Sequence, residues 1–379
     1  MQMTKKKVLV VFGTRPEAIK MCPLIIELKK RKNVECKVCL TGQHKEMLNQ
    51  VMETFRIKED YNLNIMKKKQ TITDITIDVL DKLDNVMDEV IPDLVLVHGD
   101  TTTSFAAALA AFYKKIPVGH VEAGLRTGNK YSPYPEEMNR CLTSKIASFH
   151  FAPTAQNARN LENEGIVQGV YITGNTVIDS FKYTVTDNYM FENDVLKQID
   201  YDSNKIILMT AHRRENLGEP LTNIFNAVKR IAMNNSECII VYPVHPNPQI
   251  GEEAQKTLGS VHNIKLIDPV NVLDMHNLLK RCYMVLTDSG GLQEEAPALG
   301  KPVLVLRNET ERPEAVTAGT VKLVGTTEEN IVRGVQELIN SKEKYERMAN
   351  AVSPYGDGNA SRKITDIILD NNNGVENND

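Results

Sequence analysis

The sequence predicts an α/β protein built from two doubly wound, Rossmann-like domains. Short continuous runs of Val, Ile and Leu alternate with longer helical stretches over almost the whole chain. Continuous apolar strands separated by helices are typical of parallel sheets that are covered on both faces. The length of 379 residues fits two domains of roughly 150 residues each. The strand–helix rhythm also occurs twice, on either side of a polar stretch.

The first half of the chain opens on the apolar run 8–12, which predicts a fully buried strand. A helix is expected over 16–31, where apolar residues recur at helical spacing. The Ala-rich segment 104–115 predicts another helix. Further buried strands are expected at 94–97, 118–121 and 149–152.

The second half repeats this pattern, with strands expected at 206–209, 238–242, 284–286 and 303–306. The segment 185–204, rich in Asp, Asn and Tyr, separates the two halves. We place the boundary between 179 and 203. The prediction is an N-terminal domain over 1–180 and a C-terminal domain over 181–357. The polar tail 371–379 is expected to be disordered.

Composition and charge exclude several classes of protein. The net charge is −4 and 41% of the residues are hydrophobic, which argues against a disordered chain and against a dedicated nucleic-acid binder. No apolar run approaches the roughly 20 residues that a membrane-spanning helix needs, and no secretory signal is visible. The six cysteines are sparse and lack the spacing of a disulfide framework. We therefore expect a cytoplasmic protein without nucleic-acid or membrane partners.

Cys36 and Cys39 have CxxC spacing. Such a pair could form half of a zinc site or a redox pair. The residues around it alternate as in a strand, however, and no second CxxC pair follows. We favour a plain strand.

Ligands of open parallel sheets bind at the carboxyl ends of the strands, and polar residues concentrate at those positions here. The first strand runs into the segment 13–17 (GTRPE), with Lys20 one turn into the helix. Gly13 permits a tight turn. Free N–H groups at the helix start, together with Arg15 and Lys20, would bind an anion. The alternative is a capped turn with surface cations.

A second strand–helix junction, 286–296 (LTDSGGLQEEA), is more specific. The Ser-Gly-Gly of 289–291 lets backbone N–H groups approach a phosphate, and the hydroxyl adds a donor. Glu294 or Glu295 could accept from ribose hydroxyls. The alternative is a Gly-rich turn with acidic residues that favour a helix start. One anion junction per domain suggests a diphosphate held between the domains without a metal.

Three carboxylates follow successive predicted strands. Asp100 lies in HGDTTT, Glu122 in HVEAGLR, and Glu136 in PEEMNR, which enters a helix. If these strands are neighbours in the sheet, the three carboxylates lie close together at its carboxyl edge. Neighbouring carboxylates raise one another's pKa, so one of them can hold a proton while another acts as a base. Alternatively, Asp100 is an N-cap and Glu136 pairs with Arg140.

His212 stands beside two arginines in TAHRREN, after the first strand of the second domain. It could transfer a proton or contact phosphate; the alternative is a surface turn. His98, Asp100, His120 and Glu122 could be imagined as metal ligands. Because the loops already supply cations, we expect no metal.

As a set, these motifs resemble those of the non-hydrolysing UDP-N-acetylglucosamine 2-epimerases. The resemblance extends from Lys7 to Ile368 and rests, in order, on FGTRPEAIKM, TGQH, HGDTTT, HVEAGLRTG, PEEMNR, GN, TAHRREN, YPVHPNP, TDSGGLQEEAP and ERPE. It implies a GT-B-like arrangement of two Rossmann-like domains with the active site in the interdomain cleft. It also implies a C-terminal helix, 358–370, that packs back on the first domain.

The resemblance implies a reaction as well. The family interconverts UDP-N-acetylglucosamine and UDP-N-acetylmannosamine by eliminating UDP to a 2-acetamidoglucal and adding it back. No cofactor takes part. UDP-N-acetylglucosamine and UDP are the implied ligands, a homodimer is the implied assembly, and surface polysaccharide biosynthesis is the implied role.

The site residues are carried over by motif. The acid–base candidates are Asp100, Glu122, Glu136 and His212. Matching substrate-binding positions, with 274–276 bordering the uracil, are Arg15, Lys20, Arg213, Asp274, Met275, His276, Ser289, Gly290, Gly291 and Glu295.

Bacterial members are also activated by a second UDP-N-acetylglucosamine. The matching positions are Gln43, His44, Glu46, Lys69, Gln70, Glu136, Arg213 and His245. Glu46 stands where Gln is usual, and Lys69 stands where Arg is usual. Lys cannot make the bidentate phosphate contact of Arg, and Glu46 adds a negative charge. We expect activation with a weaker effector affinity.

Other functions share parts of this pattern. A relative could act on a different UDP-2-acetamido sugar or release free N-acetylmannosamine by hydrolysis. A glycosyltransferase of the same fold would need an acceptor site. A non-enzymatic sensor would need only phosphate and base contacts, so the acid–base candidates argue against it.

Overall fold

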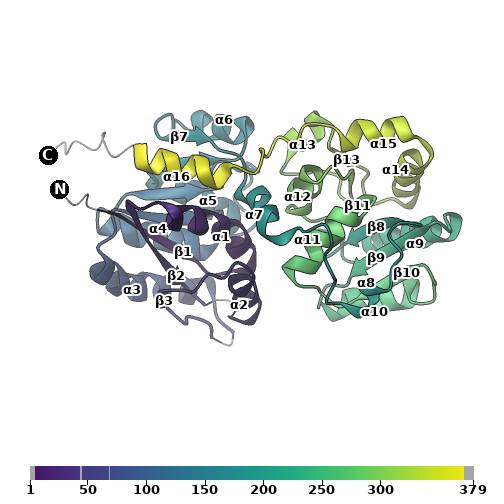
Figure 1. The fold of residues 1–379 in the computed structure, drawn as a ribbon, viewed down its shortest axis with the longest axis horizontal. Coiled ribbons are helices and arrows are strands. Elements are labelled where there is room, and N and C mark those ends of the chain that lie inside the picture. The colour runs from purple at the N-terminus through teal and green to yellow at the C-terminus, as the bar shows by residue number, and fades with distance from the viewer. Residues whose placement is uncertain (1–4, 43–44, 68, 371–379) are drawn as a thin grey trace. The chain divides into compact units, whose positions relative to one another are not determined.

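The computed structural model describes residues 5–42, 45–67 and 69–370. It divides into two compact units (Figure 1). Unit 1 comprises Met1–Tyr183 and Tyr355–Asp379, and unit 2 comprises Thr184–Pro354. The tail 371–379, expected to be disordered, lies outside the described residues.

Unit 1 contains a parallel sheet with the strand order β3-β2-β1-β4-β5-β6-β7. Its strands are β1 (Lys6–Phe12), β2 (Val34–Leu40), β3 (Tyr61–Asn62), β4 (Leu94–His98), β5 (Val118–Val121), β6 (Phe149–Ala152) and β7 (Val170–Ile172). The order reverses between β1 and β4, which are hydrogen-bonded neighbours. This is the switch point of a doubly wound sheet, where ligands bind.

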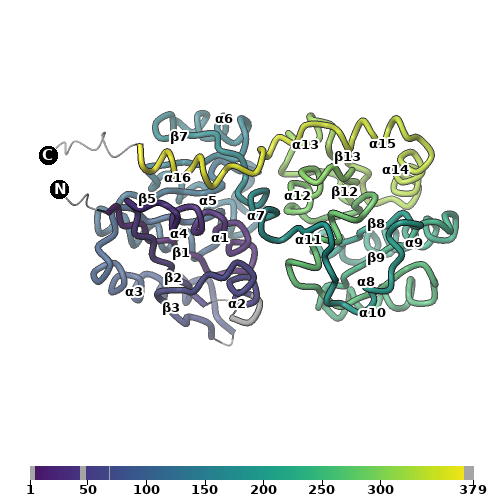
Figure 2. Tube along the Cα trace, viewed as in Figure 1, coloured from purple at the N-terminus to yellow at the C-terminus, as the bar shows by residue number. Residues whose placement is uncertain are grey.

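The helices of unit 1 follow its strands along the chain. They are α1 (Arg15–Lys30), α2 (Lys45–Thr54), α3 (Ile72–Val90), α4 (Thr102–Tyr113), α5 (Glu136–Ile146), α6 (Ala155–Asn163), α7 (Thr176–Thr184), which ends at the division, and α16 (Ala360–Asp370). Helix α16 is the last helix of the described chain, and it belongs to unit 1, where it lies against α1 (Figure 2). Arg31 Nη2 donates to Asp366 Oδ1 at 2.7 Å across this contact.

Unit 2 repeats the architecture with the strand order β10-β9-β8-β11-β12-β13. Its strands are β8 (Lys205–Thr210), β9 (Cys238–Pro243), β10 (Ile264–Ile267), β11 (Met284–Thr287), β12 (Val303–Val305) and β13 (Val321–Leu323). Its helices are α8 (Asp194–Lys197), the 3-10 turn η1 (Arg214–Asn216), α9 (Glu219–Asn234), α10 (Pro248–Leu258), α11 (Val272–Arg281), α12 (Leu292–Ala298), α13 (Pro313–Ala318), α14 (Glu328–Asn340) and α15 (Lys342–Ala349).

The predicted fold class is confirmed in both units. The central strands are buried on both faces, as their continuous apolar runs indicated. Cys36 and Cys39 lie buried within β2, so the strand interpretation of the CxxC pair is correct.

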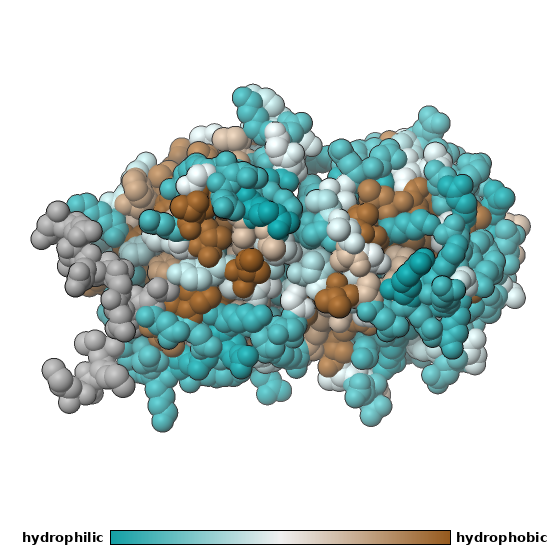
Figure 3. Space-filling model, turned by 90° about the horizontal axis from the view of Figure 1, so that it is seen from above, coloured by the Kyte–Doolittle hydropathy of each residue, from teal (hydrophilic) through white to brown (hydrophobic). Residues whose placement is uncertain are grey.

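Polar side chains predominate on the face that Figure 3 presents, with separate apolar patches among them. Within the described ranges, every helix is too short or too polar to cross a membrane.

Candidate active site

The turn after β1 is capped from within by a buried carboxylate. Thr14 is the N-cap of α1, and Glu17 Oε2 accepts the N–H groups of Gly13 at 3.0 Å and of Thr14 at 2.7 Å. The expectation that this turn offers free N–H groups to an anion is therefore wrong for these two residues, because Glu17 occupies them. Arg15, the first residue of α1 and the predicted phosphate contact of this turn, is half-buried.

Glu122 directly follows β5 and has three polar neighbours. Its Oε2 accepts hydrogen bonds from the Lys20 ammonium and, at 2.8 Å, from Asn175 Nδ2. His98 Nε2 lies 3.6 Å from the same oxygen. Burial favours the neutral acid, but the charge of Lys20 and the contact with His98 outweigh it and hold the pKa of Glu122 well below its usual value. Glu122 also has a φ of +63°, and such strain in non-glycine residues clusters at functional sites.

Asp100 lies two residues beyond β4 and is paired with an arginine from α5. Arg140 donates to Asp100 Oδ2 from Nε at 2.9 Å and from Nη2 at 2.6 Å. Its Nη1 donates to Glu137 Oε2 at 2.9 Å. Glu137 is 3% exposed, whereas Glu136, the predicted acid–base residue, is the half-buried first residue of α5. Arg140 thus fixes the Asp100 carboxylate against the helix that carries Glu136.

His120 contacts the backbone of the loop that carries Asp100. It is fully buried, and its Nε2 lies 2.7 Å from the carbonyl oxygen of Gly99. Desolvation lowers the pKa of His120 to about 3, so the imidazole is neutral. In the part of the chain that the structure describes, no group of three or more His, Cys, Asp or Glu side chains is arranged to hold a metal ion.

Gly124→Ala is expected to destabilise the loop after β5 by about 3 kcal/mol. Gly124 has a φ of +90°, and a Cβ there would lie 2.2 Å from the backbone oxygen of Asn157. The matched control is Gly128→Ala, since Gly128 has a φ of +75° with nothing within 4 Å of the added carbon. The control should cost only about 1 kcal/mol. Urea unfolding measures both, and equal losses would contradict the steric argument.

In unit 2, a buried carboxylate holds the loop after β8. Asp288 Oδ2 accepts the N–H groups of His212 and Arg213, each at 2.8 Å, and Asp288 Oδ1 lies 3.4 Å from His212 Nδ1. The rings of His212 and His245 are stacked with their centroids 5.4 Å apart. Burial is the main cause that lowers the pKa of His212, although Asp288 opposes it. A neutral His212 can accept a proton.

The Ser-Gly-Gly junction lies between β11 and α12. The Ser289 N–H donates to Thr287 Oγ1 at 2.8 Å. Arg312 lies beneath the turn, since a Cβ on Gly290 would come within 2.5 Å of its Nη1. Arg312 Nε donates to Glu294 Oε1 at 2.5 Å. Glu294 is thus committed to an internal ion pair, which leaves its neighbour Glu295 as the ribose candidate.

The segment 274–276 at the start of α11 is mostly internal. Asp274 is 1% exposed and accepts a tyrosine hydroxyl and two backbone N–H groups. His276 is equally buried, with Nδ1 2.7 Å from Thr184 Oγ1 and Nε2 3.6 Å from Glu295 Oε2. Met275 is half-buried. Met275 is therefore the least buried of the three residues expected to border the uracil.

The positions matched to effector binding are described in part. Gln43 and His44 lie outside the described residues, and of Glu46 only its place in α2 is described. Lys69 is exposed and has a φ of +58°. Gln70 Nε2 donates to a backbone carbonyl at 2.7 Å.

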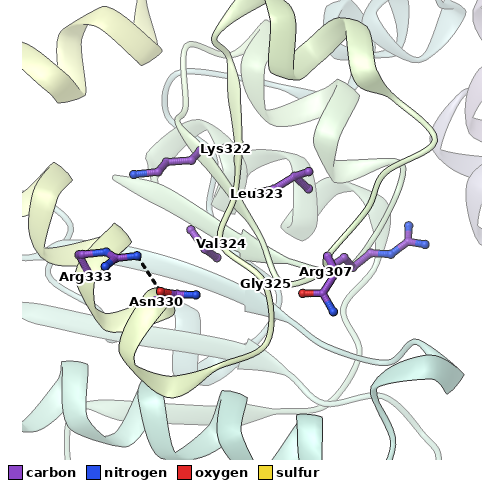
Figure 4. A pocket seen from close by; sticks show the side chains of 8 residues that line it. Arg307, Lys322, Leu323, Val324, Gly325, Asn330 and Arg333 are labelled. Atoms are coloured by element: carbon purple, nitrogen blue, oxygen red, sulfur yellow. Dashed lines mark hydrogen bonds between the residues drawn. The ribbon is translucent and has the colours of Figure 1, made fainter.

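A pocket of about 260 Å³ lies in unit 2 at the carboxyl ends of β12 and β13 (Figure 4). Arg307, Lys322 and Arg333 give its lining positive charge. Glu215 Oε1 lies 2.7 Å from Arg307 Nε, and Glu337 Oε2 lies 2.7 Å from Lys322 Nζ. Because these carboxylates neutralise two of the three cations, we assign no ligand to this pocket.

Sequence reasoning missed the residues that hold these loops, notably Glu17, Glu137 and Asp288. A signal was present for two of them. Glu17 stands three residues after Thr14, at capping-box spacing. Asp288 directly follows a buried apolar strand, which is where polar residues of parallel sheets act.

Comparison with known proteins gives consistent results. Residues 26–369 match a family model described as UDP-N-acetylglucosamine 2-epimerase. A relative of that name from Bacillus subtilis is 54% identical over 368 residues, which cover 97% of this chain and 96% of the relative.

Solved structures are similar over the same length. The Neisseria meningitidis UDP-GlcNAc 2-epimerase bound to UDP-GlcNAc is 52% identical, with a TM-score of 0.89 over 96% of this chain and 100% of that one. The Methanocaldococcus jannaschii UDP-GlcNAc 2-epimerase in complex with UDP-GlcNAc and UDP is 34% identical, with a TM-score of 0.80 over 96% and 99% of the two chains.

Proposed function

We propose that this chain, which belongs to the UDP-N-acetylglucosamine 2-epimerase family, converts UDP-N-acetylglucosamine reversibly into UDP-N-acetylmannosamine. The observation that carries the proposal is the likeness over 96% of the chain to a solved relative bound to UDP-GlcNAc. The product would supply surface polysaccharide biosynthesis.

The hydrogen on carbon 2 is not acidic enough for simple removal, so the reaction proceeds by elimination. A base accepts this hydrogen as a proton while the bond from carbon 1 to the phosphate oxygen breaks. The oxygen leaves with the electron pair as UDP, and a double bond forms between carbons 1 and 2. UDP then adds back to carbon 1 as a proton is delivered to the opposite face of carbon 2.

The residues that would accept and donate these protons are Asp100, Glu122, Glu136 and His212. Glu122 is ionised and His212 is neutral at pH 7, so both can accept protons. An anionic diphosphate would draw the Lys20 ammonium away from Glu122. Loss of that partner raises the pKa of Glu122 and makes it a stronger base when substrate is bound.

The nucleotide would be held at the strand ends described above. Arg15, Arg213, the Ser289 hydroxyl and the N–H groups of Gly290 and Gly291 would neutralise the diphosphate as charge develops on it. Glu295 would accept from the ribose, and Met275 would lie beside the uracil.

We further propose activation by a second molecule of UDP-N-acetylglucosamine, with reduced affinity. Lys69→Arg is expected to lower the effector concentration at half-activation roughly threefold or more, because a guanidinium can contact a phosphate bidentately. Initial rates from UDP-N-acetylmannosamine, with the effector titrated, measure this shift.

The control for this variant is Lys67→Arg. Lys67 is an exposed lysine two positions earlier, and it donates to Asp78 Oδ1 at 2.8 Å. Lys67→Arg should leave the effector concentration at half-activation unchanged. Strictly hyperbolic rates without a lag in the unsubstituted protein would count against activation itself.

A homodimer is the proposed assembly. Ile77 on α3, with Phe112 and Tyr113 on α4, are 57%, 58% and 68% exposed, and exposed apolar groups of this kind mark interaction surfaces. Light scattering coupled to size exclusion should give twice the monomer mass of 42.5 kDa. The free cysteines suit a reducing compartment, and we place the reaction in the cytoplasm.

Proton NMR in heavy water tests the reaction directly, with UDP-N-acetylglucosamine as the sole substrate. We expect UDP-N-acetylmannosamine that carries deuterium at carbon 2. Free N-acetylmannosamine with UDP would indicate a hydrolysing enzyme instead. An unchanged spectrum would contradict the proposal and direct the search to another UDP-sugar or to glycosyl transfer.

A further inference from the structure

Glu17 connects two loops that come from different strands. The residue is 2% exposed. Its Oε2 accepts the backbone N–H groups of Gly13 and Thr14 after β1. Its Oε1 accepts the hydroxyl of Thr101 at 2.7 Å and lies 3.1 Å from the hydroxyl of Ser104, both after β4.

The second loop is itself fastened through the same hydroxyl groups. The Ser104 hydroxyl lies 2.5 Å from the carbonyl oxygen of His98, and Thr101 Oγ1 accepts the Ser104 N–H at 3.1 Å. The segment 98–104 carries Asp100 and ends in the first turn of α4. One buried carboxylate therefore sets the position of this segment relative to the turn after β1.

Helix capping alone does not explain these contacts. A capping box needs only the hydrogen bonds between the N-cap residue and the third residue of the helix. The contacts of Glu17 with Thr101 and Ser104 reach another element, 84 and 87 residues away. Among the described residues Glu17 has no ion-pair partner, so neutral donors alone compensate its burial. A buried charge is costly unless such bonds satisfy it.

We infer that Glu17 is a positioning residue for the reaction, which aligns the loop of Asp100 with the turn of Arg15. The inference rests on the proposed function, since Asp100 would move a proton and Arg15 would bind the diphosphate. Proton transfer needs its groups within hydrogen-bond reach. A displacement of about 1 Å in such a site can cost 100-fold in rate.

Glu17→Ala should lower kcat for UDP-N-acetylglucosamine by about 10- to 100-fold and change KM by less than about threefold. Glu17→Gln should recover most of kcat. Its amide oxygen can keep the two backbone N–H groups, and its NH₂ can donate to the hydroxyls of Thr101 and Ser104. Hydrogen exchange read by mass spectrometry should rise in the segment 98–104 of Glu17→Ala, though not in Glu17→Gln.

The matched control is Asp179→Ala. Asp179 is another buried carboxylate, 3% exposed, and it accepts the N–H groups of Ala360 and Ser361 at the start of α16. Its loss should lower stability and leave kcat per folded molecule within about twofold, because its hydrogen bonds go to the start of α16 and not to the loops that carry Asp100 and Arg15.

The possible failures are distinguishable. Equal kcat losses in Glu17→Ala and Asp179→Ala, per folded molecule, would reduce Glu17 to a structural residue and overturn the inference. Unchanged exchange in the segment 98–104 would also overturn it. If the unsubstituted protein does not epimerise at all, the proposed function fails, while the exchange experiment still tests the connection between the loops.

Discussion

Glu122→Gln is expected to lower turnover of UDP-N-acetylglucosamine by about 100-fold or more. The amide cannot accept a proton, and it removes the negative charge that the Lys20 ammonium contacts. Asp100→Asn, Glu136→Gln and His212→Asn are expected to have losses of the same order. Initial rates and deuterium incorporation at carbon 2, on protein whose circular dichroism is unchanged, measure these effects.

The control for this series is Glu164→Gln. Glu164 is also paired with an arginine, since Arg126 donates to it from Nε at 2.6 Å and from Nη2 at 3.0 Å. Glu164 is the C-cap of α6, and among the described contacts its carboxylate pairs with Arg126 and with none of the four site residues, so its variant should retain at least about half of the activity. Near-full activity in all four site variants would contradict the proposed proton transfers.

The central strands could be predicted from the sequence, whereas most strands at the sheet edges could not. The strands expected at 8–12 and 94–97 lie within β1 and β4, because burial on both faces requires continuous apolar residues. The strands expected at 118–121 and 149–152 have the bounds of β5 and β6, although each contains a buried histidine. The strands β3, β7, β10 and β13 lie toward the edges, have two to four residues each, and are only partly buried. Such segments carry too few apolar residues to stand out.

The candidate site also has a part that could be predicted from the sequence and a part that could not. Topology alone places Asp100, Glu122 and His212 at the carboxyl ends of strands, so their positions could be predicted. Their partners could not, because each pairing depends on contacts between distant parts of the chain. Lys20 meets Glu122 across 102 residues, and His212 meets Asp288 across 76 residues. Nothing in a single sequence shows which donor satisfies which carboxylate.

Arg312→Met is expected to lower the free energy of unfolding by about 3–5 kcal/mol. The side chains of Arg312 and Glu294 are 8% and 4% exposed, so the substitution leaves a carboxylate buried without this cation. Loss of the guanidinium beneath Gly290 should also loosen the Ser-Gly-Gly turn and weaken UDP binding. Urea unfolding followed by circular dichroism gives the stability, and calorimetric titration with UDP gives the affinity.

Two further variants show whether this loss of stability depends on the burial of the ion pair or on the pairing alone. Arg230→Met removes a cation that lies 3.2 Å from Glu328, but those side chains are 51% and 31% exposed, so it should cost no more than about 1 kcal/mol. Replacing Arg312 and Glu294 together, by Met and Leu, removes both buried charges and should recover much of the lost stability. If the double variant is as unstable as Arg312→Met, the cost comes from lost packing around the guanidinium and not from an uncompensated carboxylate. If Arg312→Met costs no more than Arg230→Met, water reaches Glu294, and the turn proposed to hold the phosphate is supported by its backbone alone.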